Sequence, residues 1–256
     1  MNEIDLTAEE IDHILKEMII PQIIGDISPQ ANKEAFILGG QPGSGKSTLV
    51  REILKPNKNT VFINGDDLRP YHPKYYFFLK NDDREAADLT QRICNLWVEK
   101  LIEECTRQGL NMIVEGTMRT KEAPLSTAQK LKDADYLLNL VAISAPSKLS
   151  LLSLEYRYNE LKRLGGMARY TKRSSHDEAY EKIEDTIGVL SATQLFDRYD
   201  IYLRTAQGFE KRTFGPEEAK QMMEIFIAGR QRKLEDQEEK IIHLNQEFEN
   251  HNFPVK

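Results

Sequence analysis

The chain has 256 residues, a formal net charge of −6 and 30% charged residues. This length suits one sizeable α/β domain or one domain with a helical appendage, and the acidic balance argues against wholesale nucleic-acid binding. The first residues are acidic, unlike a secretory leader, and the longest apolar stretch, 136–145, is too short to span a bilayer. We therefore expect a cytoplasmic protein with no nucleic-acid or membrane partner.

The first predicted element is a helix that begins at Thr7. Thr7 and Glu10 have the spacing of a capping box, and apolar residues recur on one face of the segment that follows. We treat residues 1–33 as an N-terminal helical segment that precedes the first predicted strand.

A phosphate-binding loop follows that strand. The apolar run 35–38 predicts a buried parallel strand, and a helix is predicted to start at Lys46. Between them the sequence fits G-x-x-x-x-G-K-[ST], with the nucleotide-binding positions Gly40, Gln41, Pro42, Gly43, Ser44, Gly45, Lys46, Ser47 and Thr48. Glycines let backbone N–H groups turn toward phosphates, Lys46 reaches the β- and γ-phosphates, and the Ser47 hydroxyl is placed to bind Mg²⁺. The motif predicts a protein that binds ATP with Mg²⁺.

The second predicted strand, 60–63, leads into two adjacent carboxylates, Asp66 and Asp67. Ligands of open parallel sheets sit at the carboxyl ends of the strands, so acids here are expected to face the bound phosphates. An aspartate in this place can accept a proton from a substrate hydroxyl. The pattern favours catalysis over a simple turn, but it does not distinguish Asp66 from Asp67.

A long helix, 84–107, and a third strand, 111–114, come next. Cys94 and Cys105 share the helix, which separates them by about 16 Å along its axis. A disulfide tolerates only about 7 Å between Cα atoms, so we expect two buried, unpaired thiols. Glu99 lies off the apolar stripe of this helix, and the pattern alone indicates a solvated side chain.

The third strand delivers Glu115, Thr117 and Arg119 to the same edge of the sheet. Glu115 stands where an acid could help hold Mg²⁺ through water, or could only order the neighbouring loops. Arg119 could hold an anionic substrate or be exposed. Both alternatives stay open at this point.

A basic island spans residues 157–173, where six basic residues face a single acid, Glu160. It comes after the predicted fourth strand, 136–143, where phosphoryl-transfer enzymes of this class often carry a lid. We expect at least one arginine here to stabilise charge on the transferred phosphoryl group. His176 follows, either as a neighbour of a helix cap or as a functional residue.

The alternation of strands and helices predicts a doubly wound parallel sheet of about five strands, of the P-loop kinase type, with N- and C-terminal helical extensions. The fifth predicted strand is 200–203. The core is assigned to residues 34–215 and the C-terminal helical extension to 216–256, whose charged part is predicted to project or to pair with itself. No guanine-reading Asn-Lys-x-Asp follows a strand, which argues against a signalling GTPase, and no clear Walker B strand supports a motor or transport ATPase.

Three motifs carry a resemblance to a known family. The stretch 64–73 (NGDDLRPYHP), the stretch 115–120 (EGTMRT) and the stretch 155–158 (EYRY) resemble the zeta toxins of bacterial toxin–antitoxin systems. Ala168-Arg169-Tyr170-Thr171 followed by His176-Asp177 extends the match, which runs in unbroken order over roughly residues 34–204. The resemblance implies a kinase of the 3′-hydroxyl of UDP-N-acetylglucosamine that poisons peptidoglycan precursor synthesis, and a cognate antitoxin as partner.

The resemblance also implies roles for particular residues. The general base falls on Asp66, the sugar-nucleotide contacts on Glu99, Thr117 and Arg119, and the phosphate-clamping arginines on Arg157 and Arg169. Glu99 thereby becomes a candidate for substrate binding, and Glu115 stays a candidate for the metal or the substrate loop.

The sequence departs from the family pattern at three positions of these motifs. Asp67 stands where the family usually has Ser or Thr. Tyr170 and Lys172 stand where the family typically has Ala and Pro. A kinase of another small molecule, such as a different nucleotide sugar or an antibiotic, and an ATP-gated binding module without turnover are the alternative functions.

Overall fold

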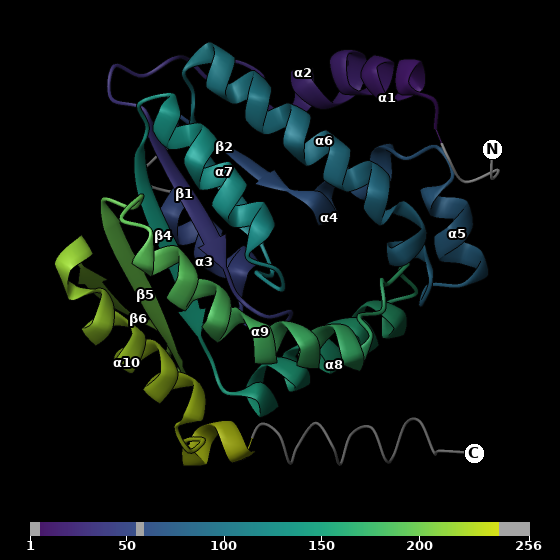
Figure 1. Cartoon of the computed structure of the whole chain (residues 1–256). Coiled ribbons are helices and arrows are strands. Elements are labelled where there is room, and N and C mark those ends of the chain that lie inside the picture. The colour runs from purple at the N-terminus through teal and green to yellow at the C-terminus, as the bar shows by residue number, and fades with distance from the viewer. Residues whose placement is uncertain (1–5, 55–58, 241–256) are drawn as a thin grey trace.

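The computed structural model describes residues 6–54 and 59–240, with the side chain of Leu54 left out. A six-stranded sheet in the order β2-β3-β1-β4-β5-β6 runs through its centre (Figure 1). The strands are β1 (Glu34–Gly39), β2 (Thr60–Asn64), β3 (Asn111–Gly116), β4 (Leu137–Ser144), β5 (Arg198–Thr205) and β6 (Gly208–Phe214). Strands β1 to β5 pair in parallel, whereas β6 pairs with β5 in the antiparallel direction. The predicted doubly wound α/β fold is confirmed, and the structure adds the sixth strand.

Helices and single turns connect these strands. The N-terminal half contains α1 (Ala8–Ile14), the π-helix η1 (Leu15–Ile19), α2 (Ile20–Ile23), α3 (Lys46–Leu54), α4 (Gly65–Leu68), η2 (Arg69–Tyr71) and α5 (Tyr75–Asn81). The C-terminal half contains α6 (Ala86–Gln108), α7 (Glu122–Asp133), α8 (Ser147–Arg163), α9 (Arg173–Ala192), η3 (Pro216–Glu218) and α10 (Ala219–Gln231). Among these helices, none combines the length and the apolar character that crossing a membrane requires.

Helices cover both faces of the sheet (Figure 1), and a layer of buried hydrophobic side chains lies on each face. Helices α1, α6, α7, α9 and α10 contribute buried side chains to one layer, and α3 packs against the other face through Leu49, Val50 and Ile53. Strand residues alternate between the layers, as β1 shows with Ile37 on one side and Leu38 on the other. Because β1 to β4 run in parallel, their carboxyl ends lie at the same edge of the sheet, and the loops that follow them meet there.

The N-terminal helices belong to the larger hydrophobic layer. The predicted capping box is present, since Thr7 Oγ1 accepts from the Glu10 N–H at 3.2 Å and Glu10 Oε2 accepts from the Thr7 N–H at 2.8 Å. Ile11 and Ile19 are buried, and Trp97 Nε1 of α6 donates to the Ile11 carbonyl at 3.1 Å. The N-terminal helices therefore pack against α6.

The C-terminal charged segment folds back onto the body as far as residue 240. Helix α10 ends at Gln231, residues 232–235 are not helical, and Arg232 Nη2 donates to the Arg204 carbonyl at 2.7 Å. Arg232 also pairs with Glu238, whose side chain is 1% exposed. The predicted projecting helix, 230–249, is therefore wrong for residues 230–240, and its remainder, 241–249, lies outside the described residues.

Both cysteines lie on α6, buried and unpaired, as predicted. Burial raises the pKa of the Cys94 thiol to about 11 and that of the Cys105 thiol to about 12. These thiols are parts of the hydrophobic layer and not reactive groups.

Candidate active site

The phosphate-binding loop joins β1 to α3 in a conformation that only glycine accepts easily. Gly43 and Gly45 have φ angles of +77° and +102°, and a Cβ atom at Gly43 would lie 2.0 Å from the Ser150 carbonyl oxygen. Lys46, 8% exposed, donates from Nζ to the Gly40 carbonyl at 2.6 Å and to the Gln41 carbonyl at 3.2 Å. The lysine therefore points along the inner side of the loop.

The remaining loop positions divide into exposed and buried groups. Ser47 and Thr48, in the first turn of α3, are exposed, so the Ser47 hydroxyl is open to a ligand. The hydroxyl of Ser44 is buried without a hydrogen-bond partner among the described residues. A buried polar group without a partner is costly, which makes Ser44 a candidate donor to a bound phosphate.

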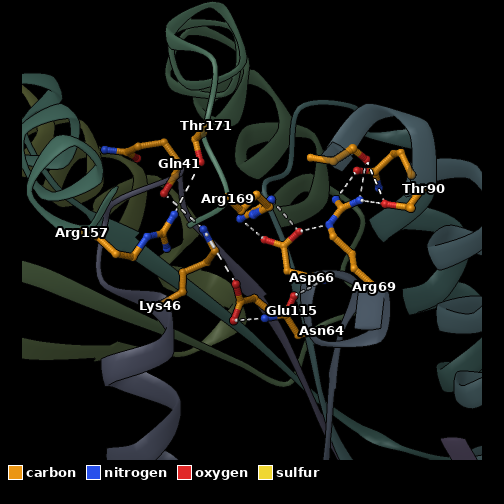
Figure 2. A network of polar contacts seen from close by, with 12 residues as sticks. Gln41, Lys46, Asn64, Asp66, Arg69, Thr90, Glu115, Arg157, Arg169 and Thr171 are labelled. Carbon is orange, nitrogen blue, oxygen red and sulfur yellow. Dashed lines mark hydrogen bonds and ion pairs between the residues drawn. The ribbon is translucent and has the colours of Figure 1, made fainter. Parts of the chain in front are cut away.

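Asp66 lies in the short helix α4, directly after β2, and is held by two arginines (Figure 2). Arg169 donates from Nη1 to Asp66 Oδ1 at 2.9 Å and from Nη2 to Oδ2 at 2.5 Å, a bidentate pair. Arg69 donates from Nε to Oδ1 at 2.9 Å. The carboxylate is thus fixed from two directions.

Arg69 is a residue whose role the sequence did not reveal. It is 3% exposed, and it donates to the Ala87 carbonyl at 2.5 Å, to Thr90 Oγ1 at 2.8 Å and to Gln91 Oε1 at 2.7 Å, all on α6. These contacts anchor Arg69 on the long helix, and through it they anchor Asp66. The only signal in the sequence was the spacing of three residues between Asp66 and Arg69, which places them on one helical face.

The two neighbouring carboxylates differ in charge environment. Desolvation by the surrounding protein atoms favours the neutral form of Asp66, but Arg169, Arg69 and Lys46 outweigh it and hold the pKa of Asp66 below its ordinary value. Desolvation by the surrounding protein atoms, followed by repulsion from Asp66, raises the pKa of Asp67 although its side chain is exposed at the surface. Asp66 is consequently the more strongly ionised of the pair, and Asp67 makes none of the arginine bonds.

Glu115, at the end of β3, lies between the loop lysine and the Asp66 segment (Figure 2). It pairs in register with Leu38 of β1 and with Asn64 of β2. Its Oε1 is 4.0 Å from Lys46 Nζ, and its Oε2 accepts from Asn64 Nδ2 at 3.5 Å. Burial raises the pKa of Glu115 against the attraction of Lys46, and repulsion from Asp66 adds to that rise.

The basic island divides into site-facing and surface-paired residues. Arg157, on α8, and Arg169 approach Lys46 and Asp66, and Arg157 Nη2 donates to Thr171 Oγ1 at 3.5 Å (Figure 2). Burial, followed by repulsion from Arg169, lowers the pKa of Arg157. The other four basic residues form ion pairs with acids outside the site: Lys162 with Asp83, Arg163 with Glu160, Lys172 with Glu85 and Asp88, and Arg173 with Asp177.

The segment that carries Arg169 is fastened to the start of α6. The Asp83 carboxylate accepts from the Tyr158 hydroxyl at 3.1 Å and from Lys162, and the Asp83 carbonyl accepts from the Tyr170 N–H at 3.4 Å. The Arg84 guanidinium lies 5.1 Å from the Tyr170 ring centroid. Tyr170 and Lys172, two of the positions that depart from the zeta toxin pattern, therefore both take part in fastening this segment.

The structure places the predicted substrate-binding residues on two sides of this edge. Thr117 and Arg119 follow β3, and Arg119 Nη1 lies 3.6 Å from Glu178 Oε2 on α9. Glu99 is exposed on α6, the helix that supports Asp66 through Arg69. In the part of the chain that the structure describes, no hydrogen bond or ion pair joins Glu99, Thr117 or Arg119 to Lys46 or Asp66, so these three residues lie around the charged cluster.

Comparison with known proteins identifies the family. A sequence profile described as Zeta toxin matches residues 22–240. Toxin PezT of Streptococcus pneumoniae serotype 4 is 33% identical over 202 residues, which cover 78% of this chain and 79% of that protein. Toxin zeta of Streptococcus pyogenes is 28% identical over 205 residues, covering 79% of this chain and 71% of that protein.

Solved structures agree with the sequence relatives. A structure from the PezAT chromosomal toxin–antitoxin system of Streptococcus pneumoniae superposes with a TM-score of 0.80 at 25% identity, covering 98% of this chain and 99% of that one. The AvrRxo1-ORF1:-ORF2 structure with ATP shares the fold, with a TM-score of 0.57 at 14% identity over 89% of this chain and 73% of that one. Because the profile covers most of the chain and a curated toxin is one-third identical to it, the chain belongs to the zeta toxin family.

Proposed function

We propose that this protein is a kinase that transfers the γ-phosphoryl group of ATP to the 3′-hydroxyl of UDP-N-acetylglucosamine and thereby acts as a bacterial toxin that blocks peptidoglycan synthesis. One observation carries the enzymatic part of the proposal. An ionised carboxylate, Asp66, lies at the same sheet edge as the phosphate-binding loop, and Arg157, Arg169 and Lys46 surround the space between them (Figure 2). This is the set of groups that phosphoryl transfer to a hydroxyl requires.

ATP is assigned to the loop of residues 40–48. Free backbone N–H groups of the loop and of the start of α3 would bind the phosphates, and the buried Ser44 hydroxyl would gain a partner there. The exposed Ser47 hydroxyl and the carboxylate of Glu115 supply oxygen ligands of the kind that Mg²⁺ takes together with phosphates and water. When bound, Mg²⁺ would neutralise charge on the phosphates.

Asp66 is assigned as the general base. Its carboxylate is held ionised by Arg169 and Arg69, so it can accept the proton of the acceptor hydroxyl as that oxygen attacks the γ-phosphorus. Lys46, Arg157 and Arg169 then stabilise the charge that develops on the transferred group. The Gly40 and Gln41 carbonyls orient Lys46, and the Glu115 carboxylate, 4.0 Å from the ammonium group, favours its charged form.

The acceptor is assigned to the neighbouring strand ends. Thr117 and Arg119, after β3, would bind the nucleotide diphosphate, and Glu99 on α6 would bind the sugar. Arg119 is partly exposed and its contact with Glu178 is 3.6 Å long, so exchanging Glu178 for a phosphate costs little. The choice of UDP-N-acetylglucosamine and of a cognate antitoxin as partner follows from the family and from the PezAT relative.

The test is phosphate transfer from γ-labelled ATP to a panel of UDP-sugars by purified protein. We expect label on UDP-N-acetylglucosamine in preference to UDP-glucose and UDP-galactose, and none with Asp66→Asn. Induction of the wild-type gene, but not of the Asp66→Asn gene, should arrest or lyse growing cells. Transfer to another small molecule instead would show that UDP-N-acetylglucosamine is not the acceptor. ATP binding without transfer to any acceptor would overturn the kinase proposal.

A further inference from the structure

A buried polar chain connects the phosphate-binding loop to the two helices around the basic island. Gln41 Nε2 donates to Ser150 Oγ at 3.3 Å and to the Ala145 carbonyl at 2.9 Å. Ser150 Oγ lies 2.8 Å from His176 Nε2, and His176 Nδ1 lies 2.9 Å from Asp177 Oδ1. Gln41, Ser150 and His176 are all 0% exposed. The chain thus joins the loop, α8 and α9 through three fully buried side chains, and its last member, Asp177, is partly exposed.

The order of donors in this chain follows from the charge of the histidine. Burial lowers the pKa of His176, which keeps the ring neutral near pH 7. The Asp177 carboxylate can only accept, so Nδ1 carries the hydrogen and Nε2 accepts from the Ser150 hydroxyl. The Ser150 oxygen then accepts from Gln41. Each member therefore fixes the orientation of the next.

A serine, a histidine and an aspartate in contact also occur in hydrolases, but here the serine is closed off. Ser150 is fully buried, and its hydroxyl lies 3.0 Å from the Ser147 carbonyl in its own helix. No substrate carbonyl can approach this oxygen. Ser150 therefore has a structural role, and its side chain meets the phosphate-binding loop at Gln41.

A second connection fastens the same loop to the same helix. Arg204 of β5 donates from Nη1 to the Gly43 carbonyl at 2.6 Å and from Nη2 to Ser153 Oγ of α8 at 2.8 Å. The missing Cβ of Gly43 lets the loop backbone approach the Ser150 carbonyl directly. Arg157 lies on α8 one turn beyond Ser153 and two turns beyond Ser150. The loop and Arg157 therefore share one rigid support.

We propose that Ser150 and His176 are positioning residues for phosphoryl transfer, which hold the phosphate-binding loop in register with Arg157. The proposal rests on the kinase function proposed above. Loss of the chain lets α8 shift relative to the loop, so that Arg157 no longer meets the transferred group. The loop keeps its internal bonds, from Lys46 to the Gly40 and Gln41 carbonyls, so ATP binding is retained.

The test compares Ser150→Ala and His176→Leu with the matched variant Ser191→Ala. Ser191 is also a buried helical serine, and it donates to the Gly188 carbonyl at 2.9 Å within α9, remote from the loop. We expect Ser150→Ala and His176→Leu to lower kcat by about 10- to 100-fold, the cost of a misplacement near 1 Å, with little change in the Kd of ATP. Ser191→Ala should keep the wild-type kcat, and His176→Gln, whose amide can accept from Ser150, should restore most of the loss.

A double mutant separates positioning from general destabilisation. If Ser150 acts through Arg157, the kcat loss of Ser150→Ala combined with Arg157→Ala should be well below the product of the single losses. Multiplicative losses, or a kcat for Ser150→Ala equal to that for Ser191→Ala, would overturn the proposal.

Amide hydrogen exchange tests the same link without any acceptor. With ADP bound, residues 40–46 should exchange faster in Ser150→Ala than in Ser191→Ala, because the loop has lost its support on α8. Equal exchange in the two variants would overturn the proposal even if transfer to UDP-N-acetylglucosamine occurs. A wild-type protein that transfers nothing to that acceptor but shows the exchange difference would overturn only the proposed function.

Discussion

Replacing Asp66 with asparagine tests the centre of the proposed mechanism. Asparagine keeps the size of the side chain and one accepting oxygen, but it cannot take the proton of the acceptor hydroxyl. We expect kcat to fall by about 10²- to 10⁴-fold, the usual contribution of a positioned general base. The Kd of ATP should not rise, since Asp66 is an anion near Lys46 and its loss removes repulsion from the phosphates.

The same variant has a predictable effect on stability. Asp66 accepts three hydrogen bonds from Arg69 and Arg169, two at Oδ1 and one at Oδ2, and asparagine can retain only the two that reach a single oxygen. Because the Asp66 side chain is 41% exposed, water replaces much of what is lost, and we expect the free energy of unfolding to fall by only about 1 kcal/mol. A loss of this size cannot account for a 10²-fold fall in kcat at 25 °C, since the protein stays folded.

Asp67→Asn is the matched control for this experiment. Asp67 is the next residue along the chain, it is exposed, and it makes none of the arginine bonds. Its replacement should change kcat much less than that of Asp66. Turnover, ATP affinity and thermal unfolding are measured for both variants. Equal losses of kcat, or a larger loss at Asp67, would refute the assignment of the base.

Three further predictions concern charges and thiols. Arg169→Ala should raise the pKa of Asp66, so the acid limb of the pH profile of kcat/KM should move to higher pH; an unmoved limb would mean that Arg169 does not hold Asp66 ionised. Arg169→Lys should rescue poorly, because an ammonium lacks the planar fork. Arg157→Ala should lower kcat by about 10²-fold or more and raise the KM for ATP far less, and a change confined to KM would show ground-state binding instead. Cys94 and Cys105 should resist thiol reagents at pH 8 until the protein unfolds, since burial raises their pKa to about 11 and about 12, and labelling of native protein would contradict their burial.

The parallel strands were predictable because each carries its own local signal. Strands β1 to β5 contain apolar runs that end where a glycine, a proline or a polar residue begins. Glu115 directly follows the apolar run of β3. Because β3 pairs with both β1 and β2, Glu115 lies between the carboxyl ends of those two strands. Strand β6 gives no such signal, since four of its seven residues are exposed and an edge strand needs only one apolar face.

The composition of the basic island could not show which arginines face the site. Its members are interleaved along 17 residues, and their partners come from elsewhere in the chain: Asp66 for Arg169, Asp83 for Lys162, and Glu85 and Asp88 for Lys172. The acids at 83, 85 and 88 pair with Lys162 and Lys172 and hold both lysines away from the site. Their effect depends on the packing of the α5–α6 connection against the α8–α9 connection, which no local pattern encodes.

The sequence around Asp66 and Asp67 contains enough information to choose between the two carboxylates, although the strand pattern alone does not use it. Asn64 caps α4 by accepting from the Asp66 N–H at 2.9 Å, so the helix begins at Gly65. Successive residues of a helix point about 100° apart, so Asp66 and Asp67 must face different surroundings. Arg69, three residues after Asp66, shares the face of Asp66, and its burial against α6 makes that face the inner one. The capping asparagine and the arginine together therefore select Asp66 as the carboxylate that faces the phosphate-binding loop.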